Sequence, residues 1–309
     1  MQHPPRPLRP LHPRSAQHEP ERHLRRGSPV KMQKKVRGAG RNPALVPAIV
    51  PCWPAPANVS ALFTTRRGGV STGCWADAQG GGGLNLGDRC GDDPKRVAAN
   101  RRRLEEAVGY PIRWLNQVHG TRVIEVSDIP VDGTVADTQR SPASAPPEAD
   151  AQVTTIAGMG LGVLVADCLP VLLADRAGSI VGAAHAGWRG LAAGVLENTL
   201  SAMRLRRPDA EFLAWIGPCI SSAAFEVGEE VVDAFVSQHP RASSHFRPAA
   251  HPGKWWGDLV GLAAQRLARA EALSVTSADT CTVGDPERLW SYRRDGACGR
   301  MAGVIALRG

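Results

Sequence analysis

Two histidines and one cysteine, far apart in the sequence, have the residue types and local surroundings of metal ligands. His119 lies in Asn-Gln-Val-His-Gly, Cys168 in Ala-Asp-Cys-Leu-Pro, and His185 begins His-Ala-Gly-Trp-Arg-Gly. Two imidazoles and one thiolate fill three positions of a tetrahedral zinc shell, and three protein ligands plus water are typical of a catalytic site. The same donors suit copper as an alternative ion. The residues therefore indicate an enzyme in which a metal ion activates water.

Other roles for these three side chains remain open at this stage. The intervals of 49 and 17 residues between them match no zinc-finger pattern, so spacing alone does not establish that they meet. Cys168 could instead be a nucleophile with a histidine as its base. A structural zinc site would need a fourth protein ligand, for which Cys219 is the candidate. A lone cysteine beside an apolar run is also often buried by packing alone.

Charged residues near these motifs are candidates for supporting roles. Asp150 and Asp167 lie at the ends of apolar segments, where a carboxylate must be paired or hydrogen bonded. Either one could orient a ligand imidazole or carry a proton, or could simply cap a strand end. Arg66, Arg293 and Arg294 are candidates for binding a phosphate or carboxylate through the planar guanidinium group.

Several familiar catalytic signatures are absent from the sequence. It contains no His-Glu-x-x-His zinc-protease motif, no P-loop and no cytidine-deaminase pair of cysteines. The glycine-rich segment 158–162 precedes a predicted strand rather than a helix, so it fails the test for a dinucleotide-binding loop.

The elements that must position the candidate ligands alternate between helix and strand patterns. Asp93 followed by Pro94 predicts a helix start, and the apolar stripe extends it to about Gly109. His119 should lie in the connection between two short strands, Cys168 at a break in a buried run, and His185 at a strand-to-helix junction. The predicted strands are 61–65, 112–114, 123–126, two within 151–175 broken at 167–170, 180–184, 212–216, 273–275 and 304–307; the predicted helices are 94–109, 187–203, 228–238 and 257–270; and the predicted loops are 66–83 and 138–149. This mixture predicts an α+β fold in one domain covering residues 50–309.

Charge is distributed unevenly along the chain. The formal net charge is +8, but residues 1–48 hold 11 Lys and Arg against 2 Glu, a net of +9, which leaves −1 for the rest. This segment also holds 9 of the 25 prolines and no apolar periodicity, so we expect a disordered basic extension. Because the remainder is nearly neutral, the composition disfavours a nucleic-acid partner.

Cysteine usage and hydropathy bear on the compartment. Seven cysteines without regular spacing do not form a disulfide framework, which favours a reducing compartment such as the cytoplasm. No apolar run approaches the roughly 20 residues of a membrane helix, so no membrane partner is expected. The sequence leaves the oligomeric state unknown.

From about Phe63 to Leu307 the chain resembles a known family. It is similar to the laccase-named multicopper polyphenol oxidase family, which includes purine nucleoside phosphorylases related to human laccase domain-containing protein 1 and the bacterial peptidoglycan editing factor. The motifs that carry the resemblance are Thr64-Thr65-Arg66, Gly68-Gly69-Val70-Ser71, Asn85-Leu86-Gly87, Asn116-Gln117-Val118-His119, Ala149-Asp150-Ala151, Ala166-Asp167-Cys168, His185-Ala186-Gly187-Trp188-Arg189-Gly190, Gly217-Pro218 and Ser291-Tyr292-Arg293-Arg294-Asp295.

The resemblance implies a fold, a ligand set and a reaction. It implies layered mixed β-sheets flanked by helices, a cysteine-hydrolase-like single domain with the site in a surface pocket, and His119, Cys168 and His185 as zinc ligands. It implies phosphorolysis of adenosine, inosine and 5′-methylthioadenosine, and deamination of adenosine to inosine by metal-activated water. For the phosphate we expect a contact from Arg66, and for Asp150 a catalytic role.

Two other enzyme activities and a non-catalytic role remain as alternatives. An amidase that edits a mis-incorporated amino acid in UDP-muramyl peptidoglycan precursors would use the same residues. A copper-dependent phenol oxidase is suggested by the family name, but one mononuclear site offers no route for four-electron reduction of oxygen. A non-catalytic binding module is the third reading.

Overall fold

The computed structural model describes residues 46–126 and 146–309. Residues 1–45 of the predicted basic extension, and residues 138–145 of the predicted loop 138–149, lie outside the described residues. None of the described helices is long and apolar enough to span a membrane.

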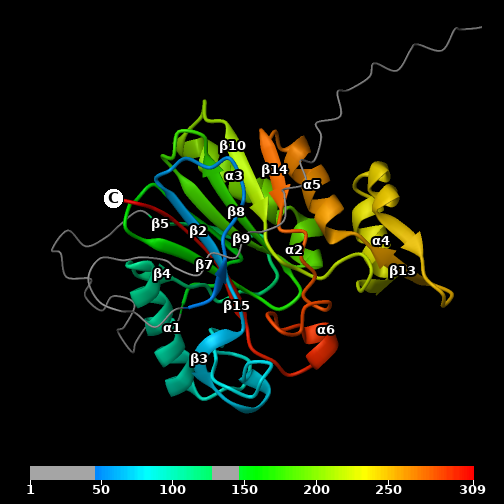
Figure 1. Cartoon of the computed structure of the whole chain (residues 1–309). Helices are drawn as coiled ribbons and strands as arrows, with labels where there is room; N and C mark the ends of the chain where they lie inside the picture. Colours follow the sequence, from blue (N-terminus) through cyan, green and yellow to red (C-terminus); the bar gives the residue numbers. More distant parts are fainter. Residues whose placement is uncertain (1–45, 127–145) are drawn as a thin grey trace, which may run out of the picture.

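Two mixed β-sheets occupy the centre of the molecule (Figure 1). The five-stranded sheet has the order β1-β2-β15-β7-β4, and the six-stranded sheet has the order β14-β10-β8-β9-β6-β5. The pairs β4–β7, β5–β6 and β10–β14 are parallel, while the other pairs in these two sheets are antiparallel. Their strands are β1 (Ala48–Ile49), β2 (Val59–Thr64), β4 (Ile112–Arg113), β5 (Val123–Val126), β6 (Ala151–Thr154), β7 (Gly160–Val165), β8 (Leu169–Asp175), β9 (Val181–Ala186), β10 (Phe212–Ile216), β14 (Ser274–Ser277) and β15 (Met301–Leu307).

Strand β8 shows why the two sheets stack on each other. Its residues are buried throughout, and their side chains alternate between two apolar clusters. Leu172 and Ala174 join the cluster between the two sheets, together with residues of β7 and β15. Leu169, Val171 and Leu173 join the cluster on the opposite face, against the helices. A strand that is apolar on both faces must be covered on both sides, so β8 lies in an inner layer.

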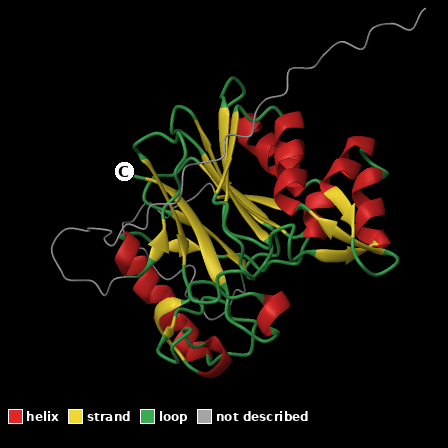
Figure 2. Cartoon of the chain, turned by 45° about the vertical axis from the view of Figure 1, so that its right-hand side comes forward, coloured by secondary structure: helices red, strands yellow, loops and turns green. Residues whose placement is uncertain are grey.

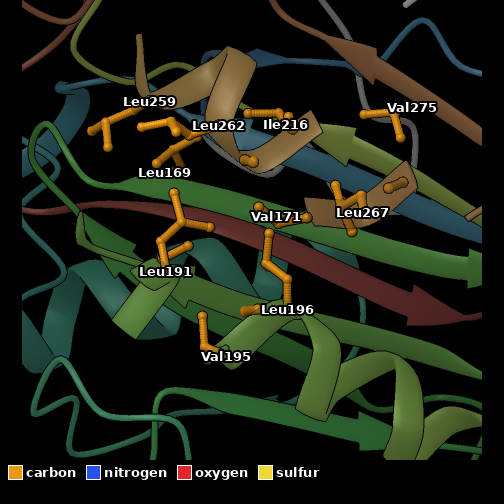
Figure 3. Packing of buried hydrophobic residues seen from close by; sticks show 14 of the residues in the cluster. Leu169, Val171, Leu191, Val195, Leu196, Ile216, Leu259, Leu262, Leu267 and Val275 are labelled. Carbon is orange, nitrogen blue, oxygen red and sulfur yellow. The ribbon is translucent and has the colours of Figure 1, made fainter. Parts of the chain in front are cut away.

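Helices cover the outer faces of both sheets, which gives four layers (Figure 2). Helix α1 (Pro94–Val108) packs Leu104 beside Val304 of β15 on the five-stranded sheet. Helices α3 (Val195–Arg206) and α5 (Leu259–Arg269) cover the six-stranded sheet, and their apolar side chains meet those of β8 and β10 (Figure 3).

Smaller elements complete the described part of the chain. A three-stranded sheet of order β11-β13-β12 lies beside α4, on the opposite side of the molecule from α1 (Figure 1). These smaller elements are β3 (Arg67–Ser71), η1 (Gly73–Trp75), α2 (Trp188–Ala193), β11 (Glu226–Gly228), α4 (Glu229–Val236), η2 (Pro240–His245), β12 (Phe246–Pro248), β13 (Lys254–Gly257) and α6 (Tyr292–Asp295).

The predicted α+β fold of layered, mixed sheets flanked by helices is confirmed. Helix α1 begins as expected, because the Asp93 carboxylate accepts a hydrogen bond from the Lys95 N–H and Pro94 occupies the first turn. The helix ends at Gly109, which has a φ of 85°.

Three predicted elements were wrong in detail. The expected loop 66–83 contains the strand β3 and the short helix η1. The expected pair of strands in 151–175 is three strands, because the chain turns at Gly158 and enters the other sheet as β7. The expected helix 187–203 is divided into α2 and α3 at Gly194, whose φ of 102° interrupts the helical backbone.

Candidate metal centre

His119, Cys168 and His185 converge on one point. One donor atom from each lies within 4.8 Å of the other two, and the Cys168 Sγ to His119 Nε2 distance is 3.8 Å. The two imidazole rings lie edge to face, with centroids 4.8 Å apart. A tetrahedral zinc ion with ordinary Zn–S and Zn–N bonds would hold S and N about 3.5 Å apart. The three donors therefore fit a zinc-sized ion.

Cys168 lies where the chain passes from the five-stranded sheet to the six-stranded sheet. It lies between the end of β7 and the start of β8, directly after Asp167, which has a φ of 87°. The Asp167 carboxylate accepts hydrogen bonds from Thr282 Oγ1 at 2.5 Å and from the Arg293 N–H at 2.7 Å. Its carbonyl oxygen accepts from the Ile220 N–H at 2.9 Å. These contacts stabilise the left-handed conformation that turns Cys168 toward the histidines.

The Asp150 carboxylate holds the His119 loop. It is fully buried and accepts hydrogen bonds from the backbone N–H groups of Val118, His119 and Gly120, at 3.2, 3.0 and 2.7 Å. His119 itself has a φ of 61°, a conformation that needs support from its surroundings. Three converging donors on one carboxylate supply that support.

The same carboxylate also orients His185. Asp150 Oδ1 lies 2.8 Å from His185 Nδ1, so Nδ1–H donates to the carboxylate and Nε2 remains available as a ligand. Burial alone would raise the pKa of Asp150, but the hydrogen bonds from His185 and the loop amides outweigh it and lower the pKa. Asp150 does not line the cavity described below, and its geometry is that of a positioning group.

Gly187 and Gly190 allow the neighbouring segments to approach closely. A Cβ atom at Gly187 would lie 2.6 Å from His119 Cδ2 and 3.2 Å from Cys168 Sγ. A Cβ atom at Gly190 would lie 2.7 Å from the Gly120 carbonyl oxygen. The glycines that follow His185 are therefore required by the packing of the site.

The charges of the three groups support one another. Burial opposes ionisation of the Cys168 thiol, but His185 and His119 outweigh it and lower the pKa of Cys168. Burial likewise opposes protonation of His185, but Cys168 and Asp150 outweigh it and raise its pKa. A thiolate beside imidazoles can bind a metal cation or act as a nucleophile, so this feature alone does not choose between the two chemistries.

The three donors open into a cavity of about 510 Å³, a size typical of small-molecule sites. Its walls combine apolar side chains with three arginines. The lining residues are Gly87, Asp88, Arg89, Cys90, Leu115, Gln117, His119, Leu164, Val165, Ala166, Asp167, Cys168, His185, Trp188, Ile220, Phe225, Leu259, Tyr292, Arg293 and Arg300.

Arg66 does not line this cavity. Its guanidinium donates to the carbonyl oxygens of Ala76, at 2.8 Å, and Pro286, at 3.0 Å, and lies over the Trp290 ring with 5.4 Å to the centroid. Arg294 is engaged in a similar way by the Asp295 carboxylate and nearby carbonyls. Of the arginines singled out in the sequence, only Arg293 lines the cavity.

A buried polar network supports the wall that carries Arg89 and Arg300. The Asn85 side-chain oxygen accepts from the N–H groups of Gly87 and Arg300, both at 2.9 Å. Its Nδ2 donates to Asp92 Oδ2 at 2.9 Å. The network extends through Ser71, which donates to Asp92 at 2.6 Å, and through Asn100, which donates to Ser71 and to backbone carbonyls. We refer to this side of the cavity, residues 87–90 with Arg300, as the polar wall.

Another part of the lining is built by apolar packing, and we refer to Ile220, Phe225 and Leu259 as the apolar wall. These residues belong to the large cluster between the six-stranded sheet and its helices. Arg293 ties this wall to the site: its guanidinium donates to the carbonyls of Ala224 and Glu226 and lies near the Phe225 ring. Its backbone N–H binds Asp167 next to Cys168.

Most residues of the two walls carried no recognisable signal in the sequence. Arg89, Arg300, Phe225 and Leu259 belong to no catalytic motif. Only the segment Asn85-Leu86-Gly87 stood out, as part of the resemblance. The structure also places Cys219 outside the metal cluster; it is buried, and its backbone forms an isolated β-bridge with Cys281.

Residues 60–308 match the protein family described as multi-copper polyphenol oxidoreductase laccase. The chain belongs to this family. It is 44% identical over 260 residues to a Pseudomonas aeruginosa protein named purine nucleoside phosphorylase PA4543, which covers 84% of this chain and 98% of that protein. It is 43% identical over 261 residues to purine nucleoside phosphorylase YfiH of Escherichia coli, again covering 84% and 98%. Among solved structures, Neisseria meningitidis protein NMB0706 superposes with a TM-score of 0.74 at 43% identity, covering 85% of this chain and 99% of that one.

Within this family the described residues contain a single cluster of His, Cys, Asp or Glu that could hold a metal ion. The comparisons thus combine a family name that suggests copper with relatives named for purine nucleoside phosphorolysis. The donor set of two imidazoles and a thiolate suits either zinc or copper.

Proposed function

We propose that this protein is a metal-dependent purine nucleoside phosphorylase whose catalytic unit spans residues 50–309. The observation that carries the proposal is the convergence of His119, Cys168 and His185 at a nucleoside-sized cavity. The names of the relatives at 44% and 43% identity support the substrate class. The substrates would be adenosine, inosine or 5′-methylthioadenosine together with phosphate, and the products the free base and the sugar 1-phosphate.

The three ligands would hold Zn²⁺, with copper as the alternative ion. When bound, the ion supplies Lewis acidity and lowers the pKa of a coordinated water molecule to about 7. Asp150 keeps His185 in the tautomer that leaves Nε2 free, and the hydrogen bonds of Asp167 keep the Cys168 thiolate on the cavity side. The same site would deaminate adenosine to inosine, with water as co-substrate and ammonia as the second product.

The two walls suggest how a nucleoside and a phosphate would share the cavity. Phe225, Ile220 and Leu259 offer an apolar surface for the purine ring. Arg89 and Arg293 line the same cavity and are exposed. Arg89 Nη1 donates to the Asn116 side chain and Arg293 Nη1 to two backbone carbonyls, so the remaining N–H groups of each guanidinium would bind the phosphate oxygens. Arg89 and Arg293 would therefore bind the phosphate. A phosphate contact from Arg66 stays a prediction from the sequence.

Product analysis of metal-loaded protein tests the reaction. We expect adenine and ribose 1-phosphate from adenosine only when phosphate is present, and inosine with or without phosphate. Both activities should be lost in Cys168→Ala and after chelation, and should return when zinc is added back to the chelated wild type. Cys74→Ala is the matched control, because Cys74 is exposed and does not line the cavity.

Two outcomes of this experiment would reject the proposed function. Absence of any purine product from protein with a measured equivalent of metal would reject the proposal, and a UDP-muramyl peptide carrying a wrong amino acid would then be the next substrate. Turnover that Cys168→Ala and chelation leave intact would also reject the metal centre as the catalytic site.

The phosphate assignment has its own test. Arg89→Ala should raise the KM for phosphate at least about tenfold, the effect of losing one charge-assisted hydrogen bond of about 1.5 kcal/mol, while adenosine deamination stays close to wild type. Arg66→Ala is the comparison variant. If Arg66→Ala raised the KM for phosphate and Arg89→Ala did not, Arg66 would be the phosphate-binding residue and Arg89 would not.

A further inference from the structure

Cys219 and Cys281 face each other across two parallel chain segments, outside the metal centre. They form an isolated parallel β-bridge just beyond the paired strands β10 and β14. The Cys219 N–H donates to the Thr280 carbonyl at 3.3 Å, and the Cys219 carbonyl accepts from the Thr282 N–H at 2.9 Å. This pattern makes Cys281 the direct partner of Cys219, with both side chains on the same side of the pair.

The spacing of such a bridge suits a disulfide. Neighbouring strands lie about 4.8 Å apart, and disulfides join residues whose Cα atoms are roughly 4.4–6.8 Å apart. The Cys281 sulfur also points toward the segment that carries Cys219, because it accepts a hydrogen bond from the Ser221 N–H at 3.4 Å. Both thiols are reduced in the structure.

The two sulfurs differ in their surroundings. Cys281 is half-buried, and although burial opposes its ionisation, the Ser221 hydroxyl and the amides of Ser221, Gly284 and Val283 lower its pKa. Cys219 is buried, and burial with the nearby Cys281 raises its pKa. An oxidant arriving from solvent would therefore meet Cys281 first, with Cys219 behind it as a resolving thiol.

We propose that Cys219 and Cys281 are a redox-active dithiol that hydrogen peroxide oxidises to a disulfide and that a thiol reductant returns to the dithiol. The Cys281 thiolate attacks one peroxide oxygen, the O–O bond breaks, and the sulfenic acid forms with release of hydroxide, which is protonated to water. The Cys219 sulfur then attacks the sulfenic sulfur, the S–S bond forms, and the sulfenic oxygen leaves as a second water. Two thiols are oxidised by two electrons, and the peroxide is reduced to two water molecules.

The position of this pair connects it to the cavity. Ile220, next to Cys219, lines the cavity and donates its N–H to the Asp167 carbonyl. Thr282, next to Cys281, donates its hydroxyl to the Asp167 carboxylate. A covalent bond between the two cysteines would act on two of the segments that hold Asp167, directly before Cys168. Oxidation of the pair would therefore change the position of Asp167 and, through it, of Cys168.

Peptide mapping of the full-length protein after treatment with hydrogen peroxide tests the dithiol without relying on any activity. The Cys168→Ala variant is used, so that Cys168 cannot exchange with the pair. We expect a cross-linked peptide joining Cys219 and Cys281, and a titre of free thiols that falls by two and returns on reduction with dithiothreitol. Cys52 and Cys74, both exposed, serve as internal controls that should keep their thiols at the same peroxide dose.

Two variants make the result decisive. Cys281→Ser keeps an acceptor for the Ser221 N–H, and it should abolish both the cross-link and the loss of the Cys219 thiol. Cys219→Ala should leave Cys281 as a sulfenic acid that a dimedone probe captures. A cross-link to a different cysteine, or oxidation of Cys281 that proceeds without loss of the Cys219 thiol in the Cys168→Ala protein, would overturn the proposal.

Discussion

The two walls of the cavity are built by different forces. The polar wall depends on a few buried hydrogen-bonding side chains, of which Asn85 alone contacts Gly87, Asp92 and Arg300. The apolar wall depends on burial of Phe225, Leu259 and their neighbours in the largest cluster of the fold. Hydrogen bonds have strict geometry, whereas apolar contacts are nondirectional and spread over many atoms.

This difference suggests that the two walls contribute differently to binding near the candidate ligands. The polar wall can fix the backbone of Gly87 and Arg300 with little room for adjustment, while the apolar wall can tolerate several ring systems. A substitution in the polar wall should therefore change a defined contact, and one in the apolar wall should change stability and affinity together. The following predictions test this contrast.

The largest effect should come from Asp150, which lies in neither wall and holds both the His119 loop and His185. Asp150→Ala removes the acceptor of three loop amides and of His185 Nδ1, so it should destabilise the metal-free protein by about 4 kcal/mol. Urea unfolding in the presence of a chelator measures this change. Asp150→Asn keeps the shape and one acceptor, and it should lower metal affinity by about 10- to 100-fold with a smaller loss of stability.

If Asp150→Ala unfolded at the wild-type urea concentration, the carboxylate would not be the support that its hydrogen bonds indicate. Asp175 offers a control outside the site. It is buried and accepts hydrogen bonds from Ser179 and Ile180, so Asp175→Asn should affect stability while leaving metal affinity unchanged.

The apolar wall should give the second largest effect. Phe225 is 7% exposed and packs in the main cluster, so Phe225→Ala should cost about 3 kcal/mol of stability. The same variant should raise the KM for nucleoside with a smaller change in kcat, since the ring would contact the base and not the reacting bond. Steady-state kinetics at a temperature well below the unfolding midpoint separates the two effects. An unchanged KM for nucleoside in Phe225→Ala would show that Phe225 does not contact the base.

The polar wall should give a smaller loss of stability and a more specific loss of function. Asn85→Ala leaves the Gly87 and Arg300 amides without their acceptor, at a cost of about 2 kcal/mol. Because Arg89 and Arg300 would shift, phosphate affinity should fall more than nucleoside affinity. Asn85→Asp keeps the acceptor but replaces the Nδ2 donor with a carboxylate oxygen facing Asp92, so it should not recover the lost stability. Equal changes for both substrates would contradict the contrast between the walls.

The smallest effect should come from a residue in neither wall. Leu205 is 83% exposed on α3, and Leu205→Ser should change the free energy of unfolding by less than about 0.5 kcal/mol. Both KM values should equal those of the wild type. A larger change would mean that this surface is covered by another chain under the conditions of the measurement.

The sequence predicted the elements well where local rules decide them. The start of α1 at Asp93 and Pro94 follows from capping chemistry, and β10 follows from a short apolar run. It failed where one residue changes the path of the chain. Gly194 falls within a continuous apolar helix pattern in the sequence, although its positive φ separates α2 from α3.

For the site, the sequence supplied the three donors but not the walls. His119, Cys168 and His185 are chemically unusual in their segments, so their residue types alone mark them as candidate ligands. Arg89 and Phe225 are ordinary residues whose role depends on which loops meet, and that depends on strand order. Arg66 illustrates the reverse case: a motif arginine whose guanidinium is occupied by backbone carbonyls rather than directed into the cavity.

Strand β15 determines when the five-stranded sheet can form during synthesis on the ribosome. It lies between β2 and β7, yet it follows every other described strand in the sequence. Until residues 301–307 leave the exit tunnel, β2 and β7 have an empty position between them, and the layer that supports Cys168 is unfinished. Long-range pairings of this kind fold late. A nascent chain would therefore complete the layer behind Cys168 only after residues 301–307 have emerged, so the three candidate ligands would be brought together late in folding.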